Sequence, residues 1–308
     1  MKGSNKLPDK GRKSLFQKIF GGDRMGWIFV APSLILFMIT LGYPILYAIK
    51  LSFFDVALDY SEKFVGFKNF RNMLNNKWFW NSLKITLTYT FSSVSLTLLI
   101  GLAIATALNA RWLKFRKLFH MLFLVPWTLS YVVIGTLWRW ILNSSYGVIN
   151  AIFQSLHWTT QNISFLGDPK YALPMVIFVN VWRNVPFTIV MLYAGLQLVP
   201  QDQIEASLVD GATGFQSYIH VTLPHLSGVI STTTILNIIW TFIQFDLTQV
   251  LTQGGGPNHA TELLSNLIYA TSFKYYEFGN GAAISVLMLI IVLLLTIVYS
   301  KLLDKQNE

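Results

Sequence analysis

Residues 205–211 read Glu-Ala-Ser-Leu-Val-Asp-Gly, and residues 221–224 read Val-Thr-Leu-Pro. This polar segment lies between two long apolar runs, residues 171–198 and 224–251. Each run is long enough to cross a bilayer, whose hydrocarbon core needs about 20 consecutive apolar residues in a helix. The sequence therefore predicts two membrane-spanning helices joined by a connection in water. A partner that binds this connection would be able to move both helices.

The composition of the whole chain is that of a membrane protein. Of its 308 residues, 53% are hydrophobic and 12% are charged, whereas about 25% of residues are charged in a typical soluble protein. Lipid offers no hydrogen bonds to exposed backbone, and the apolar run 283–298 lacks the alternation of a barrel strand, so helices are expected. We predict an all-α membrane protein with six transmembrane helices: 27–54, 83–109, 118–142, 171–198, 223–251 and 282–303.

Basic residues indicate the orientation of these helices. Lys and Arg collect in the N-terminal segment 1–26, in the second-to-third connection 110–117 and at 301–305. An even number of spans places all three on one side, and the positive-inside rule makes that side the cytoplasm. The basic residues of 55–81 would then lie outside, in partial conflict with the positive-inside rule. The even number of spans outweighs this conflict. Both termini are therefore expected to be cytoplasmic, with tails at 1–26 and 304–308 and a membrane domain at 27–303.

Several classes of function are disfavoured. The net charge of +9 is explained by the segments expected at the inner face, where basic residues meet anionic lipid, so we expect no nucleic-acid partner. The absence of cysteine excludes disulfides and thiolate metal sites. The chain contains no phosphate-binding Gly-x-x-x-x-Gly-Lys-Ser/Thr, no His-Glu-x-x-His and no Gly-x-Ser-x-Gly. We therefore expect no ATP site, no metal site and no catalytic residue in this chain.

Turn chemistry predicts two short helices within the 199–222 connection. Asp202 is a suitable N-cap, with Glu205 three residues later at the position of a capping-box partner. Gly211 supplies a left-handed residue that ends this first helix. A second short helix is expected over 213–220. Pro224 then starts the next span in its first turn, where proline costs no hydrogen bond.

The side chains of the connection favour a protein partner. Asp202, Glu205 and Asp210 lie there without any Lys or Arg, which is unusual for a loop on the side where basic residues collect. The apolar residues of the connection are Ile204, Leu208, Phe215 and Tyr218. These side chains would be left in water unless a partner or the helices covered them.

Polar side chains inside spans are costly in lipid and are therefore functional candidates. They recur three or four residues apart beside tryptophans, which puts the fifth-span set on one helical face. The candidates are Asn180, Trp182, Arg183 and Asn184 in the fourth span and Asn237, Trp240, Thr241 and Gln244 in the fifth. Amides suit the hydroxyls of a sugar, and aromatic rings suit its apolar faces. Hydrogen bonding between helices is an equally good explanation for any one of them.

Two arginines fall within the spans. Arg139 lies between Trp138 and Trp140 near the outer end of the third span, where its side chain is expected to snorkel to the interface. Arg183 lies deeper and is expected to pair with a carboxylate or a carbonyl, with Asp246 as a candidate partner. Because a phosphorylated substrate would also use an arginine, a sugar phosphate remains an alternative to an uncharged sugar.

The pattern over residues 205–224 resembles the cytoplasmic signature of permease subunits in binding-protein-dependent ABC importers, in which Glu-Ala-Ala and a later Gly precede Ile-x-Leu-Pro. The resemblance covers nearly the whole chain and is strongest to carbohydrate permeases of the maltose and glycerol-phosphate type. Further matching segments are 65–70 (Val-Gly-Phe-Lys-Asn-Phe), 146–150 (Tyr-Gly-Val-Ile-Asn), 180–182 (Asn-Val-Trp) and 251–257 (Leu-Thr-Gln-Gly-Gly-Gly-Pro). Two positions depart from the signature, Ser207 for the second Ala and Val221 for Ile, and both changes are small.

The resemblance implies a type I ABC importer permease core whose first short connecting helix inserts into a groove on a separate ATPase subunit. Glu205 would pair with a basic residue of the ATPase, Ala206 and Ser207 would permit close approach, and Gly211 would make the bend. Helix capping is an alternative role for Glu205. The residues expected to couple this chain to the ATPase are Glu205, Ala206, Ser207, Asp210, Gly211, Leu223 and Pro224.

The resemblance also places sugar contacts on the third, fourth and fifth spans. Positions that match them include Trp127 and Tyr131 in the third span. The residues expected to line the substrate pathway are therefore Trp127, Tyr131, Asn180, Trp182, Asn184, Asn237, Trp240, Thr241 and Gln244.

The sequence thus predicts a permease subunit of a carbohydrate (oligosaccharide) importer in the bacterial cell membrane. The expected partners are a second permease, which we expect to be a different chain, two ATPase subunits that bind ATP and Mg, and an external solute-binding protein. A permease for glycerol phosphate or another small solute of the same importer class is the alternative. An ATP-independent membrane enzyme or channel-like scaffold belongs to another class, and the absence of paired acid–base residues in the spans disfavours it.

Overall fold

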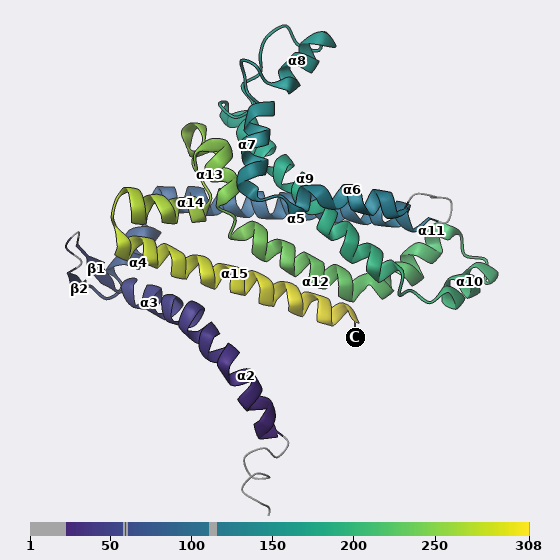
Figure 1. Cartoon of the computed structure of the whole chain (residues 1–308), viewed down its shortest axis with the longest axis horizontal. Helices are drawn as coiled ribbons and strands as arrows, with labels where there is room; N and C mark the ends of the chain where they lie inside the picture. The colour runs from purple at the N-terminus through teal and green to yellow at the C-terminus, as the bar shows by residue number, and fades with distance from the viewer. Residues whose placement is uncertain (1–22, 58, 60, 111–115, 308) are drawn as a thin grey trace, which may run out of the picture. The chain divides into compact units, whose positions relative to one another are not determined.

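The computed structural model describes residues 23–57, 59, 61–110 and 116–307 (Figure 1). Most of the predicted N-terminal tail and the basic residues Arg111 and Lys114 lie outside these described residues. The chain divides into two compact units, Met1–Lys50 and Leu51–Glu308, which are described separately.

The described part of the first unit is helical. It comprises α2 (Asp23–Phe37), a π-turn (Met38–Gly42) and α3 (Tyr43–Leu51). Pro44 explains the π-turn, because proline donates no hydrogen bond and its ring clashes with the carbonyl four residues earlier. Residues Phe29–Leu51 are long and apolar enough to cross a membrane, in agreement with the predicted first span.

The second unit begins with a small hairpin and continues as helices (Figure 1). Its elements before the 199–222 connection are β1 (Phe54–Val56), β2 (Glu62–Phe64), α4 (Lys68–Leu74), α5 (Lys77–Asn109), α6 (Arg116–Thr128), α7 (Tyr131–Ile141), α8 (Val148–Ser155) and α9 (Pro169–Leu196). Those that follow are α10 (Gln201–Val209), α11 (Gly214–Ser217), a π-turn (Tyr218–Thr222), α12 (Leu223–Phe242), α13 (Asp246–Thr252), a 3-10 turn (Pro257–His259), α14 (Leu264–Tyr269), a π-turn (Ala270–Lys274) and α15 (Phe278–Asn307).

The hairpin corrects the prediction of a purely helical chain. β1 and β2 pair antiparallel, with Phe54 opposite Phe64 and their rings 5.4 Å apart, edge to face. The turn between them is stabilised by Asp59, whose carboxylate accepts hydrogen bonds from the Ser61 amide and hydroxyl. Cross-strand aromatic pairs of this kind stabilise short ladders. The fold class is therefore helical with one small two-stranded sheet.

Three helices of the second unit match predicted spans. α5, α9 and α15 contain residues Lys77–Asn109, Pro169–Leu196 and Phe278–Lys301, each long and apolar enough to cross a membrane. They confirm the predicted spans at 83–109, 171–198 and 282–303 to within a few residues. Helix α15 continues past the predicted span to Asn307.

The third and fifth predicted spans are not continuous helices. The segment 118–142 is divided between α6, which contains Pro126, and α7, whose N-cap Ser130 accepts a hydrogen bond from the Val133 amide at 3.3 Å. The segment 223–251 is divided between α12 and α13, which are bent by 47°. Hydropathy misses both breaks because the residues at them are mostly apolar. By length and composition, the described residues contain four possible spans, or five if the bent pair crosses as one.

The core of the second unit is built around α5 and α9, and α12 packs against both of them and against α15. Small residues allow the close approach of α5 and α9, since Gly101 faces Thr188 directly. The polar residues on the buried face of α5 are Ser82, Thr86, Thr90, Ser93 and Thr97. The exposed face of α15 carries Leu293, Leu294, Ile297 and Val298. Polar residues inside and apolar residues outside are what a lipid environment favours.

We predict that Gly101→Ala destabilises the protein. A Cβ at residue 101 would lie 2.5 Å from Thr188 Cγ2, and Thr188 is held by a hydrogen bond from Asn237 Nδ2 to its hydroxyl. Overpacking of this kind costs about 1–3 kcal/mol. The measurement is the melting temperature of the purified protein in detergent. Gly228→Ala is the matched control, because a Cβ there meets nothing within 4 Å and alanine favours a helix. Equal melting temperatures for the two variants would contradict the packing described here.

Candidate functional site

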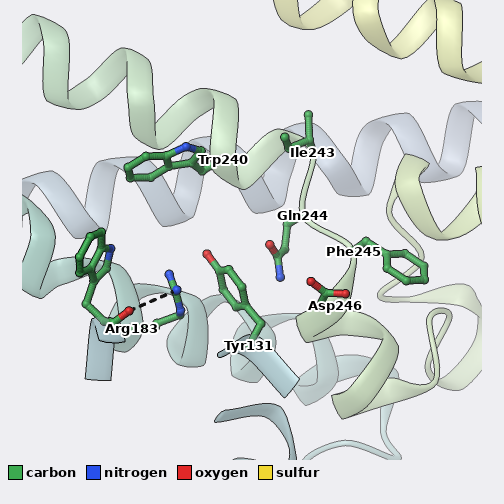
Figure 2. Close-up of a pocket in the computed structure, with 8 residues that line it drawn as sticks. Tyr131, Arg183, Trp240, Ile243, Gln244, Phe245 and Asp246 are labelled. Carbon is green, nitrogen blue, oxygen red and sulfur yellow. Dashed lines mark hydrogen bonds between the residues drawn. The ribbon is translucent and has the colours of Figure 1, made fainter. Parts of the chain in front are cut away.

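A cavity of about 410 Å³ lies where the two divided spans break (Figure 2). Its lining residues are Trp127, Tyr131, Arg183, Trp240, Ile243, Gln244, Phe245 and Asp246. Trp127 and Tyr131 flank the break between α6 and α7, and residues 240–246 span the break between α12 and α13. The breaks themselves therefore supply most of the wall, and Arg183 of α9 completes it.

Arg183 is held against this wall by three groups (Figure 2). Its guanidinium carbon lies 3.7 Å from the centre of the Tyr131 ring, a close cation–π contact. Nη1 donates to Asn184 Oδ1 at 3.0 Å, and Nη2 donates to the Trp127 carbonyl at 3.3 Å. The Trp127 carbonyl is near the end of α6, so the break supplies the acceptor.

The carbonyl alternative predicted for Arg183 is therefore correct, and the Asp246 alternative is wrong. Both residues lie on the cavity, but no ion pair joins them among the residues that the structure describes. In Figure 2, Tyr131 and Gln244 lie between the two charges. Arg183 instead uses Asn184 and the Trp127 carbonyl as acceptors for Nη1 and Nη2, while its Nε has no partner among the described residues.

Asn180 and Asn184 lie behind Arg183 and are buried. Asn184 Nδ2 donates to Asn180 Oδ1 at 3.0 Å, one helical turn away, while Asn184 Oδ1 accepts from Arg183. The Tyr131 hydroxyl also lies 3.5 Å from Asn184 Oδ1. These asparagines do not line the cavity but fix the position of the arginine that does.

Asn237, Thr241 and Trp182 also lie away from the cavity lining. Asn237 Nδ2 donates to Thr188 Oγ1 at 3.1 Å and to the Thr233 carbonyl, so it ties α12 to α9. Thr241 is buried. Trp182 packs edge to face on Trp138 at 5.5 Å and lines a separate apolar cavity of about 580 Å³. For Asn237, the alternative of hydrogen bonding between helices fits this geometry.

Gln244 differs from these residues because it lines the cavity and has an unpaired amide nitrogen, whereas the unpaired Nδ2 of Asn180 belongs to a residue outside the lining. Gln244 is 5% exposed, and its Nε2 has no hydrogen-bond partner within the described part of the chain. Its backbone carbonyl accepts a hydrogen bond from the Ser265 hydroxyl, which holds the break between α12 and α13 in place. An unpaired buried donor is costly, and a polar ligand would satisfy it.

The structure thus brings together Trp127, Tyr131, Trp240 and Gln244 from the sequence-predicted set. It adds Ile243, Phe245 and Asp246, which the sequence analysis did not place in the pathway, together with Arg183. Ile243, Phe245 and Asp246 have in common that they lie at a helix break, whereas Arg183 lies within α9. Only the position of the break places those three residues in the cavity wall, and hydropathy does not reveal the break.

The connection between α9 and α12 forms a second candidate site. Helix α10 has Pro200 as its N-cap and no side-chain cap, so the predicted N-cap Asp202 and its capping-box partner Glu205 are wrong; Asp202 lies in the first turn. Gly211 has φ +90°, as predicted for a left-handed residue. The Gly211 amide donates to the Leu208 carbonyl and the Ala212 amide to the Ser207 carbonyl. These two bonds form a Schellman ending.

The second predicted short helix is instead the beginning of a long one. Thr213 and Gln216 form the capping box that starts α11, and residues Gly214–Phe242 continue as one helix. A π-turn precedes Pro224, as it precedes Pro44, because proline interrupts the hydrogen-bond ladder. Helix α12 has Pro224 in its first turn, as predicted, but it continues α11 through the π-turn and does not follow a separate short helix.

Ser207 joins the two helices of the connection, since its hydroxyl donates to Ser217 Oγ at 2.7 Å. Leu223 is half-buried, whereas Pro224 and Asp210 are exposed. We call five exposed residues of the connection the docking surface: Glu205, Ala206, Leu208, Val209 and Phe215. Within the described residues, the Glu205 carboxylate makes no hydrogen bond or ion pair. Val209 is 87% exposed and Phe215 is 73% exposed, which is unusual for apolar side chains in water.

Taken together, the fold and the cavity define a helical membrane protein with a polar, aromatic-lined site between broken spans. The family model described as "Binding-protein-dependent transport system inner membrane component" matches residues 97–306. The chain therefore belongs to this family, as the sequence resemblance predicted.

Curated relatives match along nearly their whole length. The chain is 36% identical to the trehalose/maltose transport system permease protein MalF of Thermococcus litoralis, over 90% of this chain and 93% of that protein. It is 30% identical to the arabinooligosaccharides transport system permease protein AraP of Bacillus subtilis, over 96% and 94%. A chain from the crystal structure of a bacterial ABC transporter involved in the import of the acidic polysaccharide alginate is similar in fold, with a TM-score of 0.82, 21% identity and coverage of 96% and 99%.

We predict that the Tyr131 ring stabilises the cavity wall by holding Arg183. Tyr131→Leu removes the cation–π contact, which is worth about 2 kcal/mol when desolvated, and should lower the melting temperature. Tyr131→Phe keeps the ring and loses only the long contact to Asn184, so its cost should stay below about 1 kcal/mol. Thermal unfolding of the two variants in the same detergent measures the difference. Equal losses would show that the ring does not hold the arginine.

Proposed function

We propose that this chain is the permease of an ATP-driven carbohydrate importer and forms the translocation pathway together with a second permease. The single observation that carries the proposal is the cavity at the two helix breaks, with Trp127, Tyr131 and Trp240 beside the free donor of Gln244. Aromatic faces suit the apolar faces of sugar rings, and fixed polar groups suit their hydroxyls. The names of MalF and AraP refer to transport of trehalose, maltose and arabinooligosaccharides, which favours an oligosaccharide as the substrate class.

The energy source in this proposal is a separate ATPase. The sequence contains no phosphate-binding loop, so ATP and Mg would be bound by two ATPase subunits on the cytoplasmic side. The docking surface, with an unpaired Glu205 beside exposed Leu208 and Phe215, has the mixture of charge and apolar area that a protein partner covers. An external solute-binding protein would deliver the sugar.

The structure suggests how motion would reach the cavity. Residues Gly214–Phe242 form one helix that begins beside the docking surface and ends at the break lined by Ile243 and Gln244. Ser207 ties α10 to the start of this helix. A rigid-body displacement of the connection by the ATPase would therefore be passed along the helix to the cavity wall.

We predict that Glu205→Lys abolishes uptake while the protein still inserts into the membrane. Reversal of one partner in a buried charge pair costs about 2 kcal/mol or more, so uptake should fall by more than about tenfold. The measurement is sugar uptake by membrane vesicles that contain the whole transporter, with the amount of inserted chain checked by immunoblot.

Gln203→Lys is the matched control for this charge change, because Gln203 is exposed on the same helix but outside the docking surface. It should transport normally. A bulky residue such as Leu at Gly211 should act like Glu205→Lys, because the φ of +90° is strained for any side chain. Normal transport by both Glu205→Lys and Gly211→Leu would remove the docking role.

We predict that Gln244→Leu and Asn237→Leu change different properties of the protein, the first its KM for uptake and the second its melting temperature. Gln244→Leu removes a donor that has no partner among the described residues, so KM for uptake should rise about three- to tenfold while the melting temperature stays unchanged. Asn237→Leu leaves the buried Thr188 hydroxyl without its donor, so the melting temperature should fall. Uptake kinetics and thermal unfolding, measured on both variants, separate the two roles. An unchanged KM in Gln244→Leu would exclude this amide from the substrate site.

A further inference from the structure

Asp246 brings an unpaired carboxylate to the cavity. It is the first residue of α13, it is exposed, and it lines the same cavity as Gln244 (Figure 2). Across the residues that the structure describes, its side chain makes no hydrogen bond and no ion pair. The carboxylate is therefore available to whatever enters the cavity.

The positive charge of the cavity is much less available. The Arg183 guanidinium is covered by the Tyr131 ring and is held back by Asn184 and the Trp127 carbonyl. Tyr131 and Gln244 also separate it from Asp246 in Figure 2. Arg183 lines the same cavity, but its guanidinium is engaged by Tyr131, Asn184 and Trp127, so a ligand near Gln244 meets an unengaged charge at Asp246.

A buried polar side chain, that of Gln244, lies beside this carboxylate (Figure 2). Gln244 is 5% exposed and its Nε2 has no partner among the described residues, and Figure 2 shows the amide between Tyr131 and Asp246. A donor and an acceptor side by side match a sugar hydroxyl, which both accepts and donates. An anionic group at the same place would gain from the amide but would be repelled by the carboxylate.

The fold by itself does not set the charge of the solute. The structural neighbour described above belongs to an importer of an acidic polysaccharide. A relative that is 28% identical, from Agrobacterium fabrum, is named a sulfoquinovosyl glycerol transport system permease protein. The fold therefore leaves selection by charge to side chains, those that line the cavity among them.

We propose that Asp246 is the specificity-determining residue of this cavity, which admits uncharged carbohydrates and excludes anionic ones such as uronic acid oligomers and sugar phosphates. The proposal depends on the proposed function in one respect, which is that the solute is a carbohydrate. The repulsion of anions by Asp246 does not depend on the proposed function, because a carboxylate at the cavity repels any anion that enters. A favourable interaction with the first turn of α13 is the alternative role of Asp246, and that role would not select among solutes.

The experiment uses the absence of cysteine from this chain. Ile243→Cys places one thiol at an exposed position of the cavity lining. The full chain, co-expressed with its partner subunits and reconstituted in nanodiscs so that both faces are accessible, is treated at low salt with a cationic (trimethylammonium-ethyl) or an anionic (sulfonato-ethyl) methanethiosulfonate. Intact mass spectrometry of this chain gives both labelling rates, and each is divided by the rate with free 2-mercaptoethanol.

We expect the corrected ratio of cationic to anionic labelling to exceed one. It should fall about fourfold in Asp246→Asn, because one charge on the order of 10 Å away in a water-like medium changes the two labelling rates in opposite directions. Glu277→Gln is the matched control, because Glu277 is exposed and outside the cavity; it should leave the ratio unchanged. Phe245→Cys, in the same lining, serves as a second reporter.

The proposal is overturned if Asp246→Asn leaves the ratio unchanged at both reporters, or if the anionic reagent is the faster one in the parent chain. A ratio that responds to Asp246→Asn supports it even if no sugar is transported. Failure of the charge selection and failure of the carbohydrate function are thus separate results.

Discussion

The constraint on which this structure depends is that lipid cannot satisfy backbone hydrogen bonds, so a spanning helix can break only where protein or a cavity covers the break. Two of the predicted spans break here, at residues 129–130 and 243–245, and both breaks border one cavity. The side chains and carbonyls released at the breaks become its wall: the Trp127 carbonyl accepts from Arg183, and the Gln244 carbonyl accepts from Ser265. The helix breaks therefore form the wall of the site.

Arg183 shows how a charge is tolerated at this depth. Its positive charge is spread over the Tyr131 ring and two hydrogen bonds, and the buried Asn184 and Asn180 support it from behind. The cost of keeping a charge within a span is reduced by contacts from three different helices. One result is that α6, α7 and α9 are held together at the cavity.

The connection between α9 and α12 is organised to act as one rigid part. A Schellman ending at Gly211, a capping box at Thr213 and the Ser207–Ser217 hydrogen bond fix α10 against α11. Because α11 continues through the π-turn into α12, the docking surface and the cavity lie at opposite ends of one helix. This continuity gives the proposed coupling a physical path and does not require any flexible element between the two sites.

The sequence by itself determined the membrane class, the spans now seen as α5, α9 and α15, the left-handed Gly211 and the family, because long apolar runs and local turn chemistry need no tertiary context. Its polar spacing and its family resemblance also indicated Trp127, Tyr131, Trp240 and Gln244 as candidates for the substrate pathway. Only the tertiary structure decided where spans break, since Leu129, Ile243 and Phe245 are as apolar as a continuous helix would require. It also separated Asn237, whose Nδ2 donates to Thr188, from Gln244, whose Nε2 has no hydrogen-bond partner in the described chain. Both amides lie on one helical face in sequence, and packing against α9 alone makes one of them a structural contact and leaves the other free for a ligand.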